Sequence, residues 1–487
     1  MTSKIEIKYT QLFINNEFID SESGKKFGLI NPATEEEVAQ VSEGLKEDID
    51  KAVKAAKKAF ARGSEWRNLQ SVQRAGLLNK LADLMERDAQ QIGHIQTLEN
   101  GKPFAHSAGE IHMAAGVLRY YAGWCDKIHG QTIPTDDGTL VMTRKEPMGV
   151  AGQITPWNYP VMLFALKLGP ALATGCTLVL KPAEQTPLCN LYIAALTKEA
   201  GFPPGVVNVV PGFGPTAGAA LAEHPDVAKV AFTGSVAVGK SIMKASGCSN
   251  LKRVTLELGG KSPLIIFDDV DVDEAVKLAH DAIFNFSGQI CVAAARTYVH
   301  SKIYDEFVEK SKELALKRIL GDPFDPKTEQ GPQVEKNMFE KVLGYIKTGD
   351  VEGATLVTGG KRHGNCGYFI QPTIFANVTD EMTIAKEEIF GPVQAILKFD
   401  KIEEVIERAN KTTYGLGAGV LTKDINKALK FAQEIESGTV WVNQYASLMP
   451  QTPFGGFKQS GIGRELGAES LDYYLETKTI SIKLASV

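Results

Sequence analysis

The sequence predicts an α/β protein built on two doubly wound parallel sheets. From residue 149 onward, apolar runs such as 150–154 and 177–180 alternate with segments of helical periodicity such as 160–173. Repeated strand–helix units of this kind favour parallel sheets covered by helices. A second series of units begins near Gly260 and continues to about residue 445. The helices expected in the two series include 190–200, 217–223 and 272–286. Because 487 residues exceed what one simple core organises, two or three domains are expected.

Other segments predict structure outside these units. Residues 8–31 predict short strands around turns, and amphipathic helices follow from residue 48 to about residue 122. Residues 129–148 contain glycine and proline breakers and predict an extended arm that projects from the main body. The final segment, 478–483, alternates polar and apolar residues as an exposed strand does.

The composition argues against several classes of protein. The net charge of −5 gives no reason to expect a nucleic-acid or membrane-surface partner. No apolar stretch is long enough to span a bilayer, and the N-terminus lacks the apolar core of a secretory signal. The six cysteines are scattered without a CxxC pair or a zinc-binding spacing. We therefore expect no metal site and no disulfide framework, and a reduced, cytoplasmic compartment.

A glycine-rich turn predicts a nucleotide site. Residues 234–241, GSVAVGKS, follow a predicted strand at 229–232 and match the P-loop pattern. A downstream apolar strand ends at Asp268 and Asp269, like the magnesium-binding strand of an ATPase. A glycine turn and a helix N-terminus attract phosphate in any nucleotide-binding protein, so the identity of the nucleotide stays open. The alternative is a strand–helix turn without a ligand. The segment 212–218, GFGPTAG, is only an incomplete GxGxxG pattern.

Lys181 and Glu184 follow directly after the predicted strand at 177–180. Ligands of doubly wound sheets bind beyond the carboxyl ends of the strands. Glu184 would accept hydrogen bonds from ribose hydroxyls and repel a 2′-phosphate, which favours NAD over NADP. The alternative is a surface Lys/Glu pair at helical spacing.

Three residues suggest nucleophilic chemistry. A lone cysteine such as Cys291 is more often a small buried side chain than a nucleophile. Glu257, however, stands between two leucines at a strand end, where burial of a carboxylate is costly. Asn158, in the turn TPWNYP, offers an amide that can donate to an oxyanion. The alternatives are a solvent-facing Glu257 and a merely rigid turn around Asn158.

Together these segments resemble the aldehyde dehydrogenase superfamily. Seven motifs occur in the family's order and spacing: PWN at 156–158, KPAE at 181–184, FTGS at 232–235, ELGGK at 257–261, GQIC at 288–291, EIFGP at 388–392 and PFGGFKQSG at 453–461. The resemblance covers essentially the whole chain, and residues 7–17 are similar to the eukaryotic cytosolic, retinal and mitochondrial branch. It implies an enzyme that oxidises an aldehyde with NAD, NADP being less favoured. Under this resemblance the P-loop match is accidental.

The resemblance also implies a mechanism. The Cys291 thiolate would attack the aldehyde carbon. The Asn158 amide and the Cys291 backbone N–H would hold the oxyanion of the resulting thiohemiacetal. Hydride transfer to nicotinamide would leave a thioester, and Glu257 would activate the water that hydrolyses it. Lys167 and Glu465 match positions in the family's proton path or site rim.

Further positions follow from the resemblance residue by residue. Those that would bind the cofactor lie mainly at strand–helix turns: Ile154, Thr155, Pro156, Trp157, Lys181, Glu184, Gly214, Pro215, Phe232, Thr233, Gly234, Ser235, Val238, Gly239, Leu258, Glu388 and Phe390. Those that would line the substrate tunnel are Tyr159, Leu163, Leu166, Asn285, Ile290, Val292 and Leu448. Relatives usually carry Trp at the position of Leu166 and Phe at that of Asn285, and the stretch 444–450 is also unusual. The resemblance therefore implies an altered, wider pocket.

The implied domains divide the chain unequally. Residues 1–124 and 148–259 would form the NAD-binding domain, 260–459 the catalytic domain, and 129–147 with 475–485 an oligomerisation arm and strand. A homotetramer or dimer is expected, acting on a small-molecule aldehyde. Some members of this branch serve as lens crystallins with little activity. The alternative function is accordingly a catalytically silent structural paralogue that keeps the fold and the NAD site.

Overall fold

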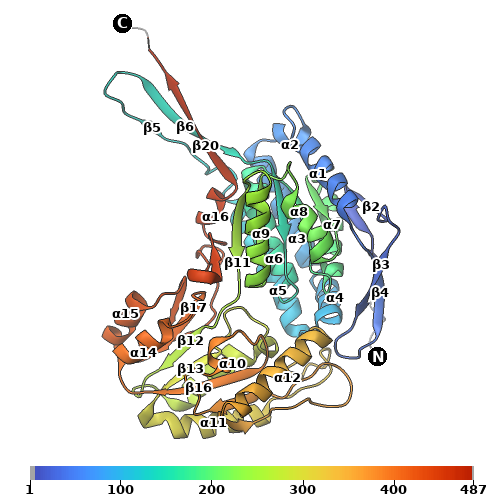
Figure 1. Cartoon of the computed structure of the whole chain (residues 1–487). Coiled ribbons are helices and arrows are strands. Elements are labelled where there is room, and N and C mark those ends of the chain that lie inside the picture. Colours follow the sequence, from blue (N-terminus) through green and yellow to red (C-terminus); the bar gives the residue numbers. More distant parts are fainter. Residues whose placement is uncertain (1–5, 485–487) are drawn as a thin grey trace.

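Two large sheets and a projecting arm make up the chain in the computed structural model, which describes residues 6–484 (Figure 1). The first sheet has eight strands in the order β19-β11-β10-β7-β8-β9-β1-β2. The bounds of its strands are β1 Leu12–Ile14, β2 Glu17–Ile19, β7 Val150–Ile154, β8 Thr177–Lys181, β9 Val207–Val209, β10 Lys229–Thr233, β11 Arg253–Glu257 and β19 Gly461–Ile462. The five strands from β7 to β11 run parallel.

The order of these strands determines where a ligand can bind. The parallel part of the sheet starts at β7 and continues outward through β8 and β9. The chain then returns and places β10 on the other side of β7. The connections therefore reverse direction between β7 and β10, and such a switch point opens a crevice at the carboxyl ends of the strands.

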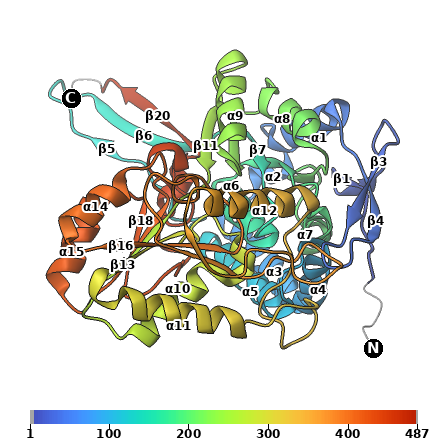
Figure 2. The same cartoon turned by 60° about the horizontal axis from the view of Figure 1, so that its bottom comes forward.

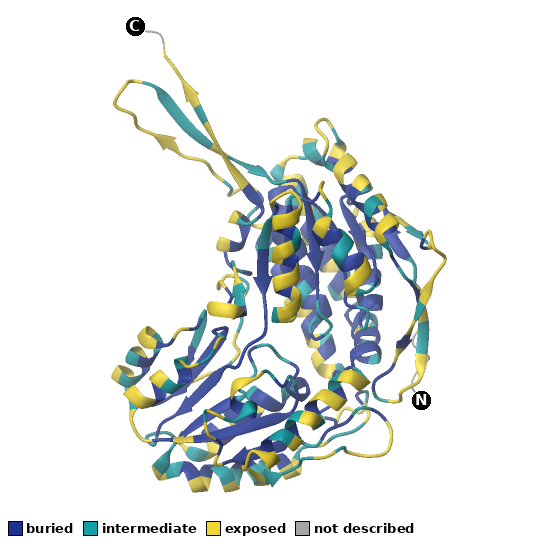
Figure 3. Cartoon of the chain, viewed as in Figure 1, coloured by how far each residue is buried: buried dark blue, intermediate teal, exposed yellow. Residues whose placement is uncertain are grey.

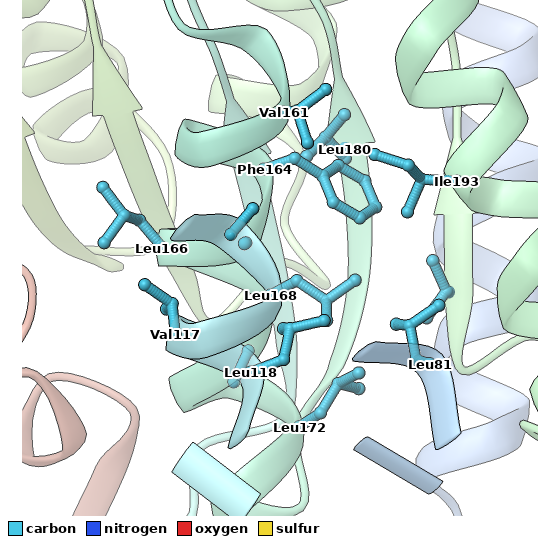
Figure 4. Close-up of a cluster of buried hydrophobic side chains, with 14 of the residues drawn as sticks. Leu81, Val117, Leu118, Val161, Phe164, Leu166, Leu168, Leu172, Leu180 and Ile193 are labelled. Carbon is cyan, nitrogen blue, oxygen red and sulfur yellow. The ribbon is translucent and has the colours of Figure 1, made fainter. Parts of the chain in front are cut away.

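Helices cover both faces of the first sheet. One face packs against α3 Ser71–Arg87, α4 Ala89–Asn100, α5 Phe104–Ala122, α6 Pro160–Thr174 and α7 Pro187–Ala200. Figure 4 shows part of this core, where Phe164 of α6 lies near Leu180 of β8. The other face packs against α1 Lys46–Phe60, α8 Ala219–Glu223 and α9 Val236–Cys248. Smaller elements are α2 Glu65–Asn68, α16 Glu469–Asp472 and the hairpin of β3 Lys26–Ile30 and β4 Glu37–Ser42.

The second sheet has seven strands in the order β14-β15-β16-β13-β12-β17-β18. The strands are β12 Pro263–Ile266, β13 Arg296–His300, β14 Thr355–Thr358, β15 Thr373–Ala376, β16 Val393–Phe399, β17 Gly417–Leu421 and β18 Thr439–Val442. All neighbours pair in parallel except β14 and β15. The helices around the sheet are α10 Val272–Phe284, α11 Tyr304–Lys317, α12 Lys336–Val351, α13 Thr383–Lys386, α14 Ile402–Asn410 and α15 Ile425–Glu434. Figure 2 shows α10 and α11 on one side of this sheet.

The arm is a separate three-stranded sheet of β5 Thr132–Ile133, β6 Leu140–Pro147 and β20 Leu475–Ile482. Its strands pair antiparallel from Leu475 with Pro147 to Ile482 with Leu140. Figure 3 shows the arm projecting beyond both sheets, with its strand residues other than Leu475 exposed or half-buried, whereas the central strands of the two large sheets are almost entirely buried. Within residues 6–484, no helix combines the length and apolar character that crossing a membrane requires.

The predicted fold class is confirmed, but some element boundaries differ. The helix expected at 272–286 ends at Phe284, because Phe286, Ser287 and Gly288 take φ angles of 46°, 56° and 72°. Left-handed backbone cannot continue an α-helix. The helix expected from residue 190 begins at Pro187, whose fixed φ suits a first helical position. The helix expected at 217–223 starts as α8 at Ala219, after a π-helical turn at Gly214–Gly218.

Candidate active site

The carboxyl ends of four parallel strands bring the candidate polar residues of the first sheet together. β7 leads into the turn that carries Asn158, β8 ends at Lys181, β10 at Thr233 and β11 at Glu257. Thr233 pairs with Glu257, and Ile154 pairs with Lys181. Residues far apart in the sequence thus meet at the switch point, as the topology requires.

The loop that carries Cys291 comes from the second half of the chain and is fixed by buried polar contacts. The Ser287 hydroxyl donates to the Gly331 carbonyl over 2.7 Å, and Gln289 Oε1 accepts the Val334 N–H at 2.9 Å. At Gly288 a Cβ would lie 2.0 Å from the Gly391 carbonyl oxygen. Glycine is needed at 288 for this close approach as well as for the φ of 72°.

Asn158 joins this loop to the first sheet. Its amide nitrogen donates to the Gln289 carbonyl at 3.1 Å, and its amide oxygen accepts the Tyr159 N–H at 3.0 Å. The side chain is buried, and its amide nitrogen carries a second hydrogen that can serve a ligand. The contact places an amide donor two residues from Cys291 along the loop.

Glu257 is a buried carboxylate with free bonding capacity. Its Oε2 atom has no hydrogen-bond partner among the described residues. Burial raises the pKa of Glu257 well above its ordinary value, and the neighbouring Glu465 carboxylate adds to the rise. Lys167 opposes the shift; it forms an ion pair with Glu465 and donates to Thr233 Oγ1 at 2.7 Å. A raised pKa makes the ionised form of Glu257 a stronger base than an exposed glutamate.

Cys291 is half-buried, and its surroundings disfavour the thiolate. Desolvation raises the pKa of the Cys291 thiol to about 12, and the carboxylates of Glu257 and Glu388 contribute in the same direction. In the protein alone, Cys291 is therefore a neutral thiol at physiological pH.

The turn between β10 and α9 does not form a P-loop. Ser235 caps α9 by accepting the Val238 N–H at 3.3 Å, so the helix already begins at Val236. Lys240 and Ser241 lie exposed in the second turn of this helix instead of ending a phosphate loop. Asp268 and Asp269 follow β12 of the other sheet, where Asp268 pairs with Lys302. The P-loop alternative is therefore wrong.

Glycines keep open the surface around the switch point. At Gly234 a Cβ would lie 2.4 Å from the Phe232 ring, and at Gly259 it would lie 2.2 Å from the Glu388 carboxylate. Gly214 has free space around its Cβ position and is exposed beside Pro215.

Polar groups line the same surface. The buried Lys181 ammonium donates to the carbonyls of Pro182 and Gly212, both at 2.7 Å, and lies 3.5 Å from Glu184. Glu388 accepts the Gly260 N–H at 3.0 Å. The rings of Trp157 and Phe390 pack edge to face, with their centroids 5.4 Å apart. This combination of open backbone, carboxylates and an aromatic pair fits a dinucleotide.

A cavity of about 820 Å³ opens beside Cys291. Four residues of the predicted tunnel line it: Tyr159, Asn285, Ile290 and Val292. Leu163, Leu166 and Leu448 are not among its lining residues. Leu166 is buried in the helical core instead, near Val117 of α5 (Figure 4). Leu163 and Leu448 are half-buried against the same core.

The comparisons with known proteins agree with this geometry. A model described as the Aldehyde dehydrogenase family matches residues 18–480. The chain belongs to the aldehyde dehydrogenase family.

The relatives of the chain are similar over almost their whole length. It is 58% identical to the chicken (Gallus gallus) protein Aldehyde dehydrogenase 1A1 over 481 residues, covering 99% of this chain and 94% of that protein. It is 57% identical to the mouse (Mus musculus) Aldehyde dehydrogenase, cytosolic 1 over 484 residues, covering 99% and 97%. The solved NAD+ complex of aldehyde dehydrogenase from Bacillus cereus matches with a TM-score of 0.96 and 51% identity, covering 98% and 97%. The resemblance inferred from the seven motifs is confirmed.

Sequence reasoning missed Lys102 and Glu110, which line the cavity, whereas Tyr445, which also lines it, lies in the stretch 444–450 that the resemblance places in the tunnel wall. The Tyr445 hydroxyl donates to the Val292 carbonyl at 2.8 Å and so braces the Cys291 loop. Glu110 gave a usable signal, because it falls on the same face of helix 104–122 as Ala114 and Val117, where a carboxylate is unexpected. Lys102 gave none, since a lysine after Asn-Gly is typical of an exposed turn.

Proposed function

We propose that this family member oxidises aldehydes to carboxylic acids with NAD as the hydride acceptor. The contact of the Asn158 amide with the Gln289 carbonyl carries the proposal, because it joins an oxyanion donor to the loop of the nucleophile. Family membership supports the class of reaction. The Bacillus cereus relative, whose structure holds NAD+, supports the cofactor.

In this proposal residues 1–124 and 148–259 hold the cofactor and 260–459 carry the nucleophile. Lys181 and Glu184 bind the adenosine ribose, and Glu388 binds the nicotinamide ribose. The negative charge of Glu184 would repel a 2′-phosphate, which favours NAD over NADP. When bound, the nicotinamide ring accepts a hydride, and its positive charge favours the thiolate form of Cys291.

The first chemical step is addition. The Cys291 thiol gives its proton to water, and the resulting thiolate sulfur forms a bond to the aldehyde carbon as the carbonyl π electrons move to the oxygen. The Asn158 amide and the Cys291 backbone N–H stabilise that oxyanion, each donor contributing about 3 kcal/mol to lowering the barrier. Loss of hydride from the former aldehyde carbon leaves a thioester on Cys291.

The second step is hydrolysis of the thioester. Glu257 removes a proton from water as the water oxygen attacks the acyl carbon, and the Cys291 thiolate leaves. The buried pair of Lys167 and Glu465 lies close enough to Glu257 to bias its charge. The balance is aldehyde, NAD+ and water to carboxylic acid, NADH and a proton.

We further propose a homotetramer or dimer in the cytoplasm. The exposed three-stranded arm of β5, β6 and β20 offers unpaired strand edges to a second copy of the chain. The mouse relative named as cytosolic supports the compartment.

The decisive experiment is a panel of small, medium-chain and aromatic aldehydes with NAD or NADP, read by NADH or NADPH absorbance. We expect turnover with a medium-chain or aromatic aldehyde, and faster turnover with NAD. NAD, but not ATP with magnesium, should raise Tm. Binding of NAD without turnover of any aldehyde would contradict the proposal and support a silent structural paralogue.

A further inference from the structure

A buried ion pair lies in the inner wall of the aldehyde cavity. Lys102 Nζ is 2.5 Å from Glu110 Oε2, and only 1% and 2% of their side chains are exposed. Both residues line the cavity beside Cys291, and the mechanism proposed above uses neither. Two charges removed from water are costly unless every remaining donor and acceptor is satisfied. The contacts of each partner therefore indicate what the pair does.

Glu110 uses both carboxylate oxygens. Oε2 accepts from Lys102 and from Gln96 Nε2, the latter at 2.6 Å, whereas Oε1 accepts the Met162 N–H at 2.9 Å. Met162 lies in the first turn of α6, whose N-cap residue, Tyr159, supplies no side-chain cap. A carboxylate suits the unpaired N–H groups and the positive dipole end of a helix. Glu110 thus anchors the helix whose N-cap residue, Tyr159, follows Asn158.

Lys102 faces two aromatic rings. Its ammonium lies 3.7 Å from the centroid of Tyr159 and 4.5 Å from that of Phe286. The two rings meet edge to face at 6.0 Å. Tyr159 follows Asn158, and Phe286 opens the left-handed loop that leads to Cys291. A desolvated cation over an aromatic face is an attractive contact, so one charge holds both segments.

We propose that the Lys102–Glu110 pair positions Asn158 relative to Cys291 and shapes the inner cavity through Tyr159 and Phe286. Glu110 holds the start of α6, Lys102 holds the two rings, and the ion pair couples the two sites. Both are positioning residues, since neither contacts the reacting atoms. The inference rests on the proposed function, because its main readout is aldehyde oxidation.

The test compares a broken pair with an apolar replacement of the pair. In Lys102→Met, kcat for a small aldehyde should fall by about tenfold to a hundredfold, because small misplacements of reacting groups are costly. The double variant K102M/E110M should recover part of the Tm lost in Lys102→Met, because it leaves no unpaired buried charge, although the Met162 N–H and the Gln96 amide still lose their acceptor. Its kcat should stay low. A merely structural role predicts recovery of both Tm and kcat, and that result would overturn the inference.

A second readout does not depend on turnover. Without NAD, the rate of iodoacetamide alkylation at Cys291, followed by peptide mass spectrometry, should change in Lys102→Met and in K102M/E110M. The control is Lys430→Met, which breaks the exposed pair with Glu403 and should leave kcat and alkylation unchanged. If Lys102→Met fails to fold, Glu110→Gln serves, because an amide oxygen can still accept the Met162 N–H while the charge is lost. Wild-type kcat and alkylation in Glu110→Gln would overturn the inference, whereas inactivity of the wild type would overturn the proposed function.

Discussion

The two ends of the aldehyde cavity are built differently. At the inner end, Lys102 and Glu110 line the cavity and the buried Asn158 precedes the lining residue Tyr159; each of the three is held by hydrogen bonds or an ion pair. At the outer end, Gln444 and Ala446 are exposed, and Asn285 is half-buried. A buried polar network favours one geometry, since a broken contact leaves an unsatisfied polar group. Exposed side chains can change conformation, because water replaces the contacts that they lose. The inner end is accordingly suited to fixing the chemistry and the outer end to selecting the aldehyde.

The largest effect is expected at Cys291, whose neighbours Ile290 and Val292 line the cavity. Cys291→Ala should abolish aldehyde oxidation, because the variant lacks the nucleophile of the proposed mechanism, while the rise of Tm with NAD should persist. The exposed Cys366 provides a matched control, since Cys366→Ala should retain full activity. Residual turnover in Cys291→Ala would remove the covalent mechanism.

The protonation state of Cys291 offers a test without turnover. With a thiol pKa of about 12, only a small fraction of Cys291 is thiolate in the protein alone. As long as the pH stays below the pKa, this fraction rises about tenfold for each unit by which the pH is raised. Alkylation of Cys291 by iodoacetamide should therefore increase steadily between about pH 7 and about pH 10. Added NAD should move the rise to lower pH, because a nearby positive charge favours the thiolate. A plateau near neutral pH in the protein alone would contradict a neutral thiol.

In the proposed mechanism Glu257 acts only in the second chemical step. Glu257→Gln should lower steady-state turnover by about a hundredfold to a thousandfold, the range usual for loss of a general base. A burst of about one NADH per site should remain, since addition and hydride loss precede hydrolysis. Rapid mixing with an aldehyde would detect the burst. Loss of the burst together with turnover would instead assign Glu257 to the first step.

The smallest effect is expected at the outer end. Asn285→Phe adds apolar surface to the cavity wall, so KM for a medium-chain aldehyde should fall by about threefold to tenfold. The kcat should remain within about twofold, because a change of uniform binding alters KM alone. Steady-state kinetics with a short and a medium-chain aldehyde would measure both constants. A large drop in kcat would show that the two ends are not independent.

Some of the site could be predicted from local sequence. The strand at 150–154 and the turn after it follow from a short apolar run that ends at Thr155-Pro156, and the structure places β7 at the same residues. The end of α10 could not be predicted, because Phe286 and Ser287 adopt left-handed backbone that depends on a distant segment. There, the Gly331 carbonyl accepts from the Ser287 hydroxyl, and the Gln333 amide donates to the Ser287 carbonyl. Leu166 shows a second limit: periodicity finds its helix but not which neighbour each face meets.

By itself, the sequence determined the two series of strand–helix units and the motifs that carry the family's chemistry. These depend on the order and spacing of residues along the chain, which local patterning preserves. Only the tertiary structure decided that Asn158 meets the Cys291 loop, that α9 begins at Val236 within the glycine-rich match, and that Lys102 and Glu110 share the cavity wall. The physical reason is that each depends on packing between segments distant in the chain. In the sequence, Lys102 is typical of an exposed turn. Only the fold buries it against Tyr159 and Phe286, which is what makes it a candidate positioning residue.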